Sequence, residues 1–262
     1  SNLIEQVSTF LARSTFFSSD FNLSSKKKKS LHKKFVNKNI KSIIEDLVFT
    51  NPYMDSQDNK WNNELQNDVE SVRMNGELKI AIMEMKYKLM NSPQALIHGD
   101  LHTGSILSNG KTIKVIDPEF SFMGPIGYDI GLLFVNIILH YLSQFAKTPA
   151  SSTNSRYQEY LLSLISAFWN QFKEKFLKLW EEDNSDANFM PSKYWGFSHG
   201  EIYLQTYKSN FIHNVLQDAV GFAGCRLLCG LMGFVTFHNI TNITSTGMRA
   251  RVERIALKIG TR

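Results

Sequence analysis

Apolar residues recur three and four positions apart along most of the chain, which is the period of an amphipathic α-helix. We therefore expect helices at residues 4–11, 40–47, 62–90, 127–141 and 157–180, and three more between 201 and 257. The apolar set expected to face the core in the third of these is Val69, Val72, Ile80, Met83, Tyr87 and Met90, with a break near Gly76. Polar linkers are expected at 148–155 and 183–191. The pattern predicts a mainly α protein.

The period changes in the middle of the chain. Residues 95–97 form a short apolar run, and 105–108 and 112–116 are short β-like runs separated by Asn109-Gly110. An Asn-Gly pair between two such runs is a strong signal for a hairpin turn. We therefore expect one small β-hairpin inserted into the helical protein.

Composition restricts the class of protein. Of 262 residues, 43% are apolar and 20% are charged, as in folded globular domains. The longest apolar stretch, 126–142, is interrupted by Asp129, Asn136 and His140, so no run suits a bilayer. Glu5 and Arg13 rule out the apolar core of a signal peptide near the first residue. That residue is Ser1 rather than Met, so we expect a processed chain or part of a longer one.

Two cysteines, Cys225 and Cys229, stand four residues apart in a helical segment. A disulfide framework needs more cysteines, and a structural zinc site needs four ligands. Both are therefore expected to be ordinary buried thiols, and the expected compartment is the cytoplasm.

The net charge of +5 is concentrated in six lysines between Lys26 and Lys34. Clustered lysines can bind a polyanion. Alternatively they form a solvated helix face, with Leu31 and Phe35 turned inward at i, i+4 spacing. Because no arginine or stacking aromatic residue is interleaved with them, we favour the solvated face and expect no nucleic-acid partner.

Carboxylates with a suggestive spacing surround the predicted hairpin. His98-Gly-Asp100 precedes it, and Asp117-Pro118-Glu119 follows it. Phosphoryl transfer needs one carboxylate at the attacking hydroxyl and further acidic ligands for Mg²⁺. Magnesium itself usually takes one or two carboxylates together with phosphate and water. The hairpin can bring Asp117 back beside Asp100, so the set favours a metal–phosphate site.

Taken singly, these residues have simpler explanations. Asp117 before a proline can start a turn, and Glu119 can be a surface charge. His98 is expected to orient the loop by hydrogen bonding, and His102 can be a solvated loop residue. Asp129 can cap or brace the helix after Gly127 by accepting backbone N–H bonds. Their order around one hairpin is what favours the functional interpretation.

Longer segments around and beyond these motifs carry a family resemblance. They are Leu96-Ile-His-Gly-Asp-Leu-His-Thr-Gly-Ser105, Val115-Ile-Asp-Pro-Glu-Phe120, Gly124-Pro-Ile-Gly-Tyr-Asp-Ile-Gly131, Phe16-Phe-Ser-Ser-Asp-Phe21, Leu47-Val-Phe-Thr-Asn-Pro52 and Gly221-Phe-Ala-Gly224. With these segments the sequence resembles the 5-methylthioribose kinase family, which shares the protein-kinase-like fold with aminoglycoside phosphotransferases and choline kinases. Relatives in that fold carry Asn five residues after the motif Asp, where this chain has Ser105.

The resemblance implies roles for several residues. Asp100 would be the catalytic base, which also contacts the sugar substrate. Asp117 and Glu119 would bind Mg²⁺ and, with Pro118, the phosphates of ATP. The implied reaction converts S-methyl-5-thio-D-ribose to its 1-phosphate in methionine salvage, and the implied assembly is a homodimer.

The implied fold is the carboxyl-terminal lobe of a kinase, spanning residues 1–262. It would comprise a helical segment (1–95), the catalytic and metal-binding loops with the hairpin (96–131), and a helical substrate-side subdomain (132–262). The β-rich amino-terminal lobe is expected to be absent, because no Gly-rich phosphate loop and no strand lysine precede the motif. Alone, such a lobe is expected to bind nucleotide weakly and to be inactive.

One departure concerns the acceptor. The family carries two adjacent arginines that hold the sugar, and the matching positions here are Cys229-Gly230. Neither residue can donate a charge-assisted hydrogen bond. Arg226, one helical turn earlier, is the candidate substitute, although an arginine there can equally brace the helix. A kinase of the aminoglycoside or choline type and a catalytically silent binding lobe therefore remain alternatives.

Overall fold

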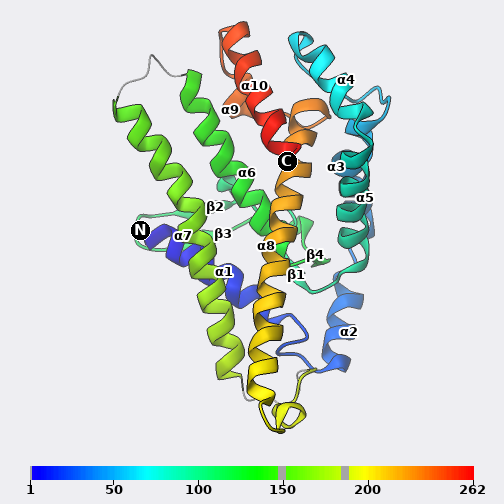
Figure 1. Ribbon diagram of the computed structural model, residues 1–262, viewed down its shortest axis with the longest axis vertical. Coiled ribbons are helices and arrows are strands. Elements are labelled where there is room, and N and C mark those ends of the chain that lie inside the picture. The colour runs from blue at the N-terminus through cyan, green and yellow to red at the C-terminus, as the bar shows by residue number, and fades with distance from the viewer. Residues whose placement is uncertain (1, 147–151, 184–188) are drawn as a thin grey trace.

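The computed structural model describes residues 2–146, 152–183 and 189–262, and these are mainly helical (Figure 1). The helices are α1 (Asn2–Phe17), α2 (Ser25–Lys34), α3 (Lys38–Phe49), α4 (Gln66–Met74), α5 (Gly76–Asn91), α6 (Gly127–Ser143), α7 (Ser152–Glu182), α8 (Gly200–Met232), α9 (His238–Thr241) and α10 (Thr246–Gly260). The predicted helices are therefore confirmed, including three after residue 200. The predicted linkers at 148–155 and 183–191 lie partly outside the described residues. Of the first, residues 152–155 belong to α7, so the linker expectation is wrong there.

The expected break near Gly76 is confirmed, because α4 ends at Met74 and α5 begins at Gly76. Asn75 caps α5, with its side-chain oxygen accepting from Leu78 N at 3.0 Å. The expected core face of α5 is wrong. Its four predicted core residues are all exposed, namely Ile80, Met83, Tyr87 and Met90.

The buried residues of α5 belong to a second apolar stripe with the same period, formed by Ile82, Met85 and Leu89. This stripe faces α3 and α8, which pack on one side of the helix. Two stripes of equal period cannot be ranked by periodicity alone. Tertiary packing selects between them.

The predicted hairpin is formed by β2 (Ile106–Ser108) and β3 (Ile113–Val115), which pair antiparallel with Ile106 opposite Val115. The expected hairpin is therefore confirmed, but a second pair of strands was not expected. A second two-stranded sheet joins β1 (Ala95–Ile97) to β4 (Phe122–Gly124), with Ile97 opposite Phe122. Both strands are short and largely buried, so neither shows the alternation of polar and apolar residues that marks a half-exposed strand.

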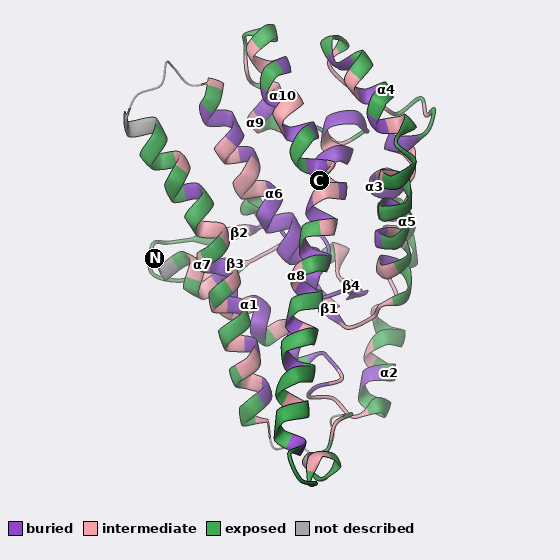
Figure 2. Ribbon diagram, in the orientation of Figure 1, coloured by how far each residue is buried: buried purple, intermediate pink, exposed green. Residues whose placement is uncertain are grey.

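Helices α6 and α8 form the centre of the molecule, with α7 packed along α6 and α1 across α7 (Figure 1). A Cβ on Gly131 would lie 2.6 Å from the carbonyl oxygen of Ala219, so the glycine permits the close approach of α6 and α8. Contrary to the expectation from the sequence, two stretches are long and apolar enough to cross a membrane, namely 127–146, which contains α6, and α8. In each, 61% of the most apolar part is buried within the protein. Figure 2 shows the buried residues gathered along these central helices. Their apolarity is accounted for by burial in the core.

The lysine-rich segment is the exposed helix α2, with one exception. Lys28 is buried, and its Nζ donates to Asp20 Oδ2 at 2.6 Å and to the carbonyl oxygen of Gln94 at 2.7 Å. The predicted inward pair, Leu31 and Phe35, is only partly buried. Lys28 therefore anchors α2 to the segment before β1. The prediction that all six lysines form a solvated face is wrong for this one residue.

Cys225 and Cys229 are free and buried, as expected. Burial raises the pKa of the Cys225 thiol to about 12. The pKa of the Cys229 thiol is also raised by burial, although Arg226 acts in the opposite direction. Both side chains therefore stay protonated at neutral pH.

Candidate active site

The loop after β1 is fixed by a carboxylate from the first turn of α6. Asp129, which has no exposed surface, accepts from the backbone N–H of His98 at 2.6 Å and of Gly99 at 3.0 Å, one on each oxygen. The sequence suggested that Asp129 caps or braces its own helix. In the structure it satisfies two backbone donors of the preceding loop instead, which explains why a charged residue is tolerated in the core.

The pKa of Asp129 is raised from 3.8 to about 6. Burial is the main cause, the hydrogen bonds from His98 and Gly99 oppose it, and the charge of Asp100 adds to it. The carboxyl group is therefore ionised at neutral pH and gains a proton in mildly acidic solution.

The His98 ring joins the two halves of the motif. Its Nε2 lies 2.7 Å from the carbonyl oxygen of Ile116, and its Nδ1 accepts from the backbone N–H of Asp100 at 3.3 Å. A carbonyl oxygen only accepts, so the proton of the neutral ring is on Nε2. The ring thus ties the Asp100 loop to the residue before Asp117.

Gly99 brings the two segments into contact. Its φ is +86°, and a Cβ at this position would lie 2.3 Å from the carbonyl oxygen of Phe120. Only glycine meets both conditions without strain. From the other side, Asn37 Nδ2 donates to the carbonyl oxygens of Glu119 at 3.0 Å and Ser121 at 3.1 Å. The segment carrying Pro118 and Glu119 is therefore held beside the loop that carries Asp100.

The segment after Asp100 forms a rigid turn. His102 and Ser105 make a reciprocal capping box around the short 3-10 turn Thr103–Ser105. The buried Ser105 hydroxyl accepts from His102 N at 3.0 Å and lies 3.1 Å from the carbonyl oxygen of Asp100. Thr103 contacts Asn136 Oδ1 of α6 through its backbone N–H and its hydroxyl. The Asp100 backbone is fixed on both sides, while its carboxylate is 38% exposed.

Asp117 and Glu119 present exposed carboxylates that make no hydrogen bond or ion pair within the described residues. Asp117 adopts φ 62° and ψ 52°, a left-handed region that non-glycine residues seldom occupy, Asp and Asn more often than the others. Pro118 then begins a short 3-10 turn. Among the described residues, no three His, Cys, Asp or Glu side chains are grouped to hold a metal. Two free carboxylates still match the small protein ligand set that Mg²⁺ uses with phosphates.

Arg226 makes local contacts on α8. Its guanidinium lies 5.5 Å from the Phe237 ring centroid, and Nη1 lies 3.9 Å from Cys229 Sγ. Its charge also lowers the pKa of the buried Tyr128, whose pKa burial raises, and Asp100 acts on the same tyrosine. A Cβ on Gly230 would lie 1.9 Å from the Phe237 ring, so a side chain at 230 would require that ring to move.

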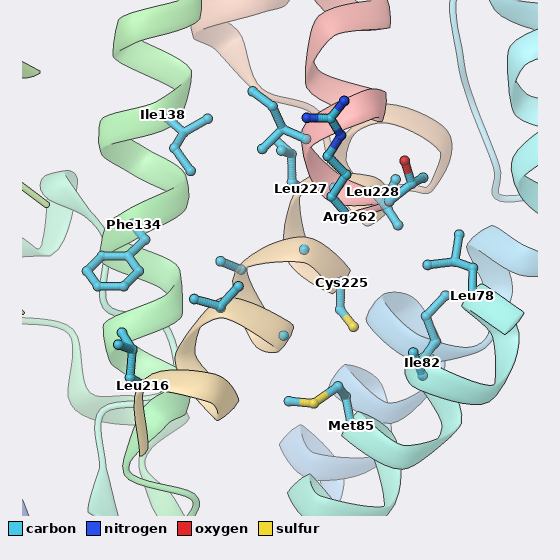
Figure 3. Close-up of a pocket in the computed structure, with 18 of the residues that line it drawn as sticks. Leu78, Ile82, Met85, Phe134, Ile138, Leu216, Cys225, Leu227, Leu228 and Arg262 are labelled. Carbon is cyan, nitrogen blue, oxygen red and sulfur yellow. The ribbon is translucent and has the colours of Figure 1, made fainter. Parts of the chain in front are cut away.

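The cavity drawn in Figure 3 is separate from the motif residues. It measures about 670 Å³ and is lined mainly by apolar residues of α5, α6, α7 and α8, including Met85, Phe134 and Leu216, together with the segment 259–262. None of the motif residues Asp100, Asp117 and Glu119 lines it. Asp117 and Glu119 are instead exposed and Asp100 partly exposed, on the segments that follow β3 and β1.

Sequence reasoning missed two residues that shape the site. Asn37 lies 82 residues before Glu119, and Asn136 lies 33 residues after Thr103. Each uses an ordinary amide to hold backbone groups of a distant loop. No local pattern marks such a residue, because its partner is defined only by the fold.

The sequence is similar to those of known phosphotransferases. Residues 49–160 match a family model described as phosphotransferase enzyme family. A methylthioribose kinase of Geobacillus sp. is 34% identical over 98% of this chain and 59% of its own length. Those of Bacillus pumilus and Bacillus cereus are 35% and 37% identical over 99% and 98% of this chain, and 60% of their own lengths. The chain therefore spans about 60% of the length of these relatives.

Over residues 49–160 the chain is therefore similar to the phosphotransferase enzyme family. Over nearly its whole length it is similar to the methylthioribose kinases.

Proposed function

We propose that this chain carries the phosphotransfer site of an ATP-dependent kinase whose acceptor is the 1-hydroxyl of S-methyl-5-thio-D-ribose, a step of methionine salvage. The observation that carries the proposal is the Asp100 carboxylate. It is partly exposed on a loop fixed by His98 and Asp129, in a chain similar over nearly its whole length to methylthioribose kinases.

Asp100 acts as the base in this proposal. Its carboxylate accepts the proton of the attacking hydroxyl and orients the hydroxyl oxygen toward the phosphorus. The fixed backbone supports this role because a base positioned in advance needs no reorganisation when the substrate binds.

Asp117 and Glu119 would hold Mg²⁺ and, with Pro118, contact the nucleotide phosphates. Their carboxylates are exposed and unpaired within the described residues, and the left-handed Asp117 backbone is the kind of strain found at functional sites. Bound Mg²⁺ would supply charge neutralisation on the phosphates of ATP.

Arg226 would contribute to the acceptor side. This is supported by its electrostatic effect on Tyr128, a residue that Asp100 also influences. If it binds the sugar, Arg226→Gln raises KM for the acceptor and leaves KM for ATP unchanged. An equal effect on both constants, accompanied by a lower Tm, would indicate a brace for Phe237 instead.

A second candidate function is a kinase for another small hydroxylated acceptor, of the choline or aminoglycoside type. It is favoured by Cys229-Gly230, where Cys229 is fully buried and the Phe237 ring fills the space beside Gly230.

The proposal further includes a kinase-like carboxyl-terminal lobe that acts as a homodimer in the cytoplasm. If the nucleotide normally binds between two lobes, this chain alone binds it weakly.

The test is ADP release by the complete gene product in the presence of Mg²⁺, with S-methyl-5-thioribose, choline and an aminosugar offered in turn. Release with S-methyl-5-thioribose alone supports the first function. Release with another acceptor alone supports the second. Absence of both turnover and nucleotide binding would mean that both are wrong and that the chain is a silent binding lobe.

A further inference from the structure

His102 is fixed in one orientation beside Asp100. Its Nδ1 accepts from the backbone N–H of Gly104 at 2.9 Å. The lone pair of Nδ1 is therefore engaged, and the proton of the neutral ring is on Nε2. That nitrogen lies 3.7 Å from Oδ2 of Asp100.

The neighbouring residues preserve this arrangement. Ser105 is buried and accepts from the backbone N–H of His102, which fixes the residue that carries the ring. A Cβ on Gly104 would lie 2.7 Å from the ring carbon Cε1, so a side chain at 104 would displace the imidazole. His102, Gly104 and Ser105 thus act together to hold the Nε2 proton toward Asp100.

The Asp100 carboxylate has no other polar partner among the side chains that the structure describes. Its backbone is bonded to His98 and Ser105, and its carboxylate lies beside the His102 ring. Both side chains are partly exposed, and the 3.7 Å between Nε2 and Oδ2 is only slightly longer than a hydrogen bond.

We propose that His102 is a positioning residue. Its Nε2–H donates a hydrogen bond to Oδ2 of Asp100, which leaves Oδ1 free for the acceptor hydroxyl. This inference rests on the proposed function. In the reaction, Oδ1 accepts the hydroxyl proton while the hydroxyl oxygen bonds to the γ-phosphorus. The bond from that phosphorus to the bridging oxygen of ADP breaks. His102 does not take the proton, because Nε2 already carries one and Nδ1 is occupied; the proton passes from Asp100 to water.

Two substitutions separate positioning from turn stability. His102→Asn places an amide oxygen where Nδ1 lies, so it keeps the bond from Gly104 and loses the donor to Asp100. His102→Gln can place an amide N–H near the position of Nε2 and restore that donor. We expect His102→Asn to keep the wild-type Tm and to lower kcat by roughly 10- to 100-fold, the scale of a misplaced base, with KM for both substrates unchanged. His102→Gln should recover kcat to within about fivefold of wild type, since it restores a single hydrogen bond.

The proposal is overturned by wild-type kcat in His102→Asn, by a kcat in His102→Gln no higher than in His102→Asn, or by a defect confined to KM for ATP. The last result would assign the ring to the nucleotide.

An NMR measurement on this chain does not depend on turnover. The ¹⁵N signals of the His102 ring should report the Nε2–H tautomer. The carboxyl ¹³C shift of Asp100 should change in His102→Asn and remain near wild type in His102→Gln. An Asp100 shift unaffected by His102→Asn would overturn the proposal. Absent turnover by wild-type protein together with the expected NMR pattern would instead overturn the proposed function while supporting the positioning contact.

Discussion

The backbone N–H of His98 donates to Oδ2 of Asp129 at 2.6 Å and so connects the loop after β1 to the first turn of α6. The second oxygen of Asp129 accepts from Gly99. The backbone that presents Asp100 is therefore fixed by a carboxylate that itself lies in the core.

Removing this carboxylate should destabilise the protein. Asp129→Ala leaves the buried N–H groups of His98 and Gly99 without partners, and each such loss costs about 1–3 kcal/mol. We expect the free energy of unfolding to fall by about 2–4 kcal/mol in urea denaturation. The control is Asp68→Ala, which breaks a surface ion pair with Arg254 and should cost less than about 1 kcal/mol. Equal costs for the two variants would contradict this account.

Asp129 also predicts a pH dependence. Its pKa is raised to about 6 in the folded state, so the folded protein binds more protons than the unfolded chain between about pH 4 and 6. The free energy of unfolding contributed by this group is highest below that window and falls as pH rises through it. The difference between a pKa of 3.8 in the unfolded chain and about 6 in the folded protein changes the free energy of unfolding by roughly 3 kcal/mol across this window.

The measurement is urea denaturation of wild type and Asp129→Asn at intervals from pH 4 to 7. Subtracting the free energy of unfolding of Asp129→Asn from that of wild type at each pH removes the contributions of the other titrating groups. The wild-type value should fall relative to that of Asp129→Asn as pH rises, and should level off above about pH 7. A difference that rises with pH, or stays constant, would show that the pKa of Asp129 is not raised.

The contact between Gly99 and Phe120 can be tested with a matched pair of glycines. Gly99→Ala and Gly110→Ala both place a side chain at a φ near +85°. A Cβ at Gly110 meets nothing within 4 Å, whereas one at Gly99 meets the carbonyl oxygen of Phe120. Gly110→Ala should cost about 1–2 kcal/mol from backbone strain. Gly99→Ala should cost at least about 1 kcal/mol more, because a packed contact must also move. Equal losses of unfolding free energy would mean that the contact with Phe120 is unimportant.

Within the lysine run, only Lys28 is expected to affect stability strongly. Lys28→Met removes the donor to Asp20 and to the carbonyl oxygen of Gln94, and should lower the free energy of unfolding by about 1–3 kcal/mol. Lys29→Met, one residue along on an exposed part of α2, should change it by less than about 0.5 kcal/mol. Thermal or urea denaturation distinguishes the two variants. Similar losses of unfolding free energy would mean that Lys28 contributes no more to stability than the solvated lysines.

Local patterns in the sequence predicted the helices, the break near Gly76 and the Asn109-Gly110 hairpin. These features depend on neighbouring residues, which periodicity and turn chemistry describe well. The pairing of β1 with β4 joins segments more than 20 residues apart, and the inward face of α5 was a choice between two equivalent apolar stripes. Neither is encoded locally.

The carboxylates of the candidate site were recognised from spacing and chemistry, but the residues that orient them were not. Asn37 and Asn136 act on loops far from them in sequence. The sequence marks Asp129 as a candidate helix cap, whereas its partners lie 30 and 31 residues earlier. A sequence can thus indicate which groups react more readily than which groups hold them in place.

The most direct test of the central claim is the product formed by the complete gene product from Mg²⁺-ATP and S-methyl-5-thioribose, followed by ³¹P NMR. Asp100→Asn serves as the matched variant, because it keeps the size of the side chain and removes the base. We predict a sugar 1-phosphate signal with wild type and its loss with Asp100→Asn, to at most about 1% of the wild-type rate. The same signal at a comparable rate with Asp100→Asn would contradict the account.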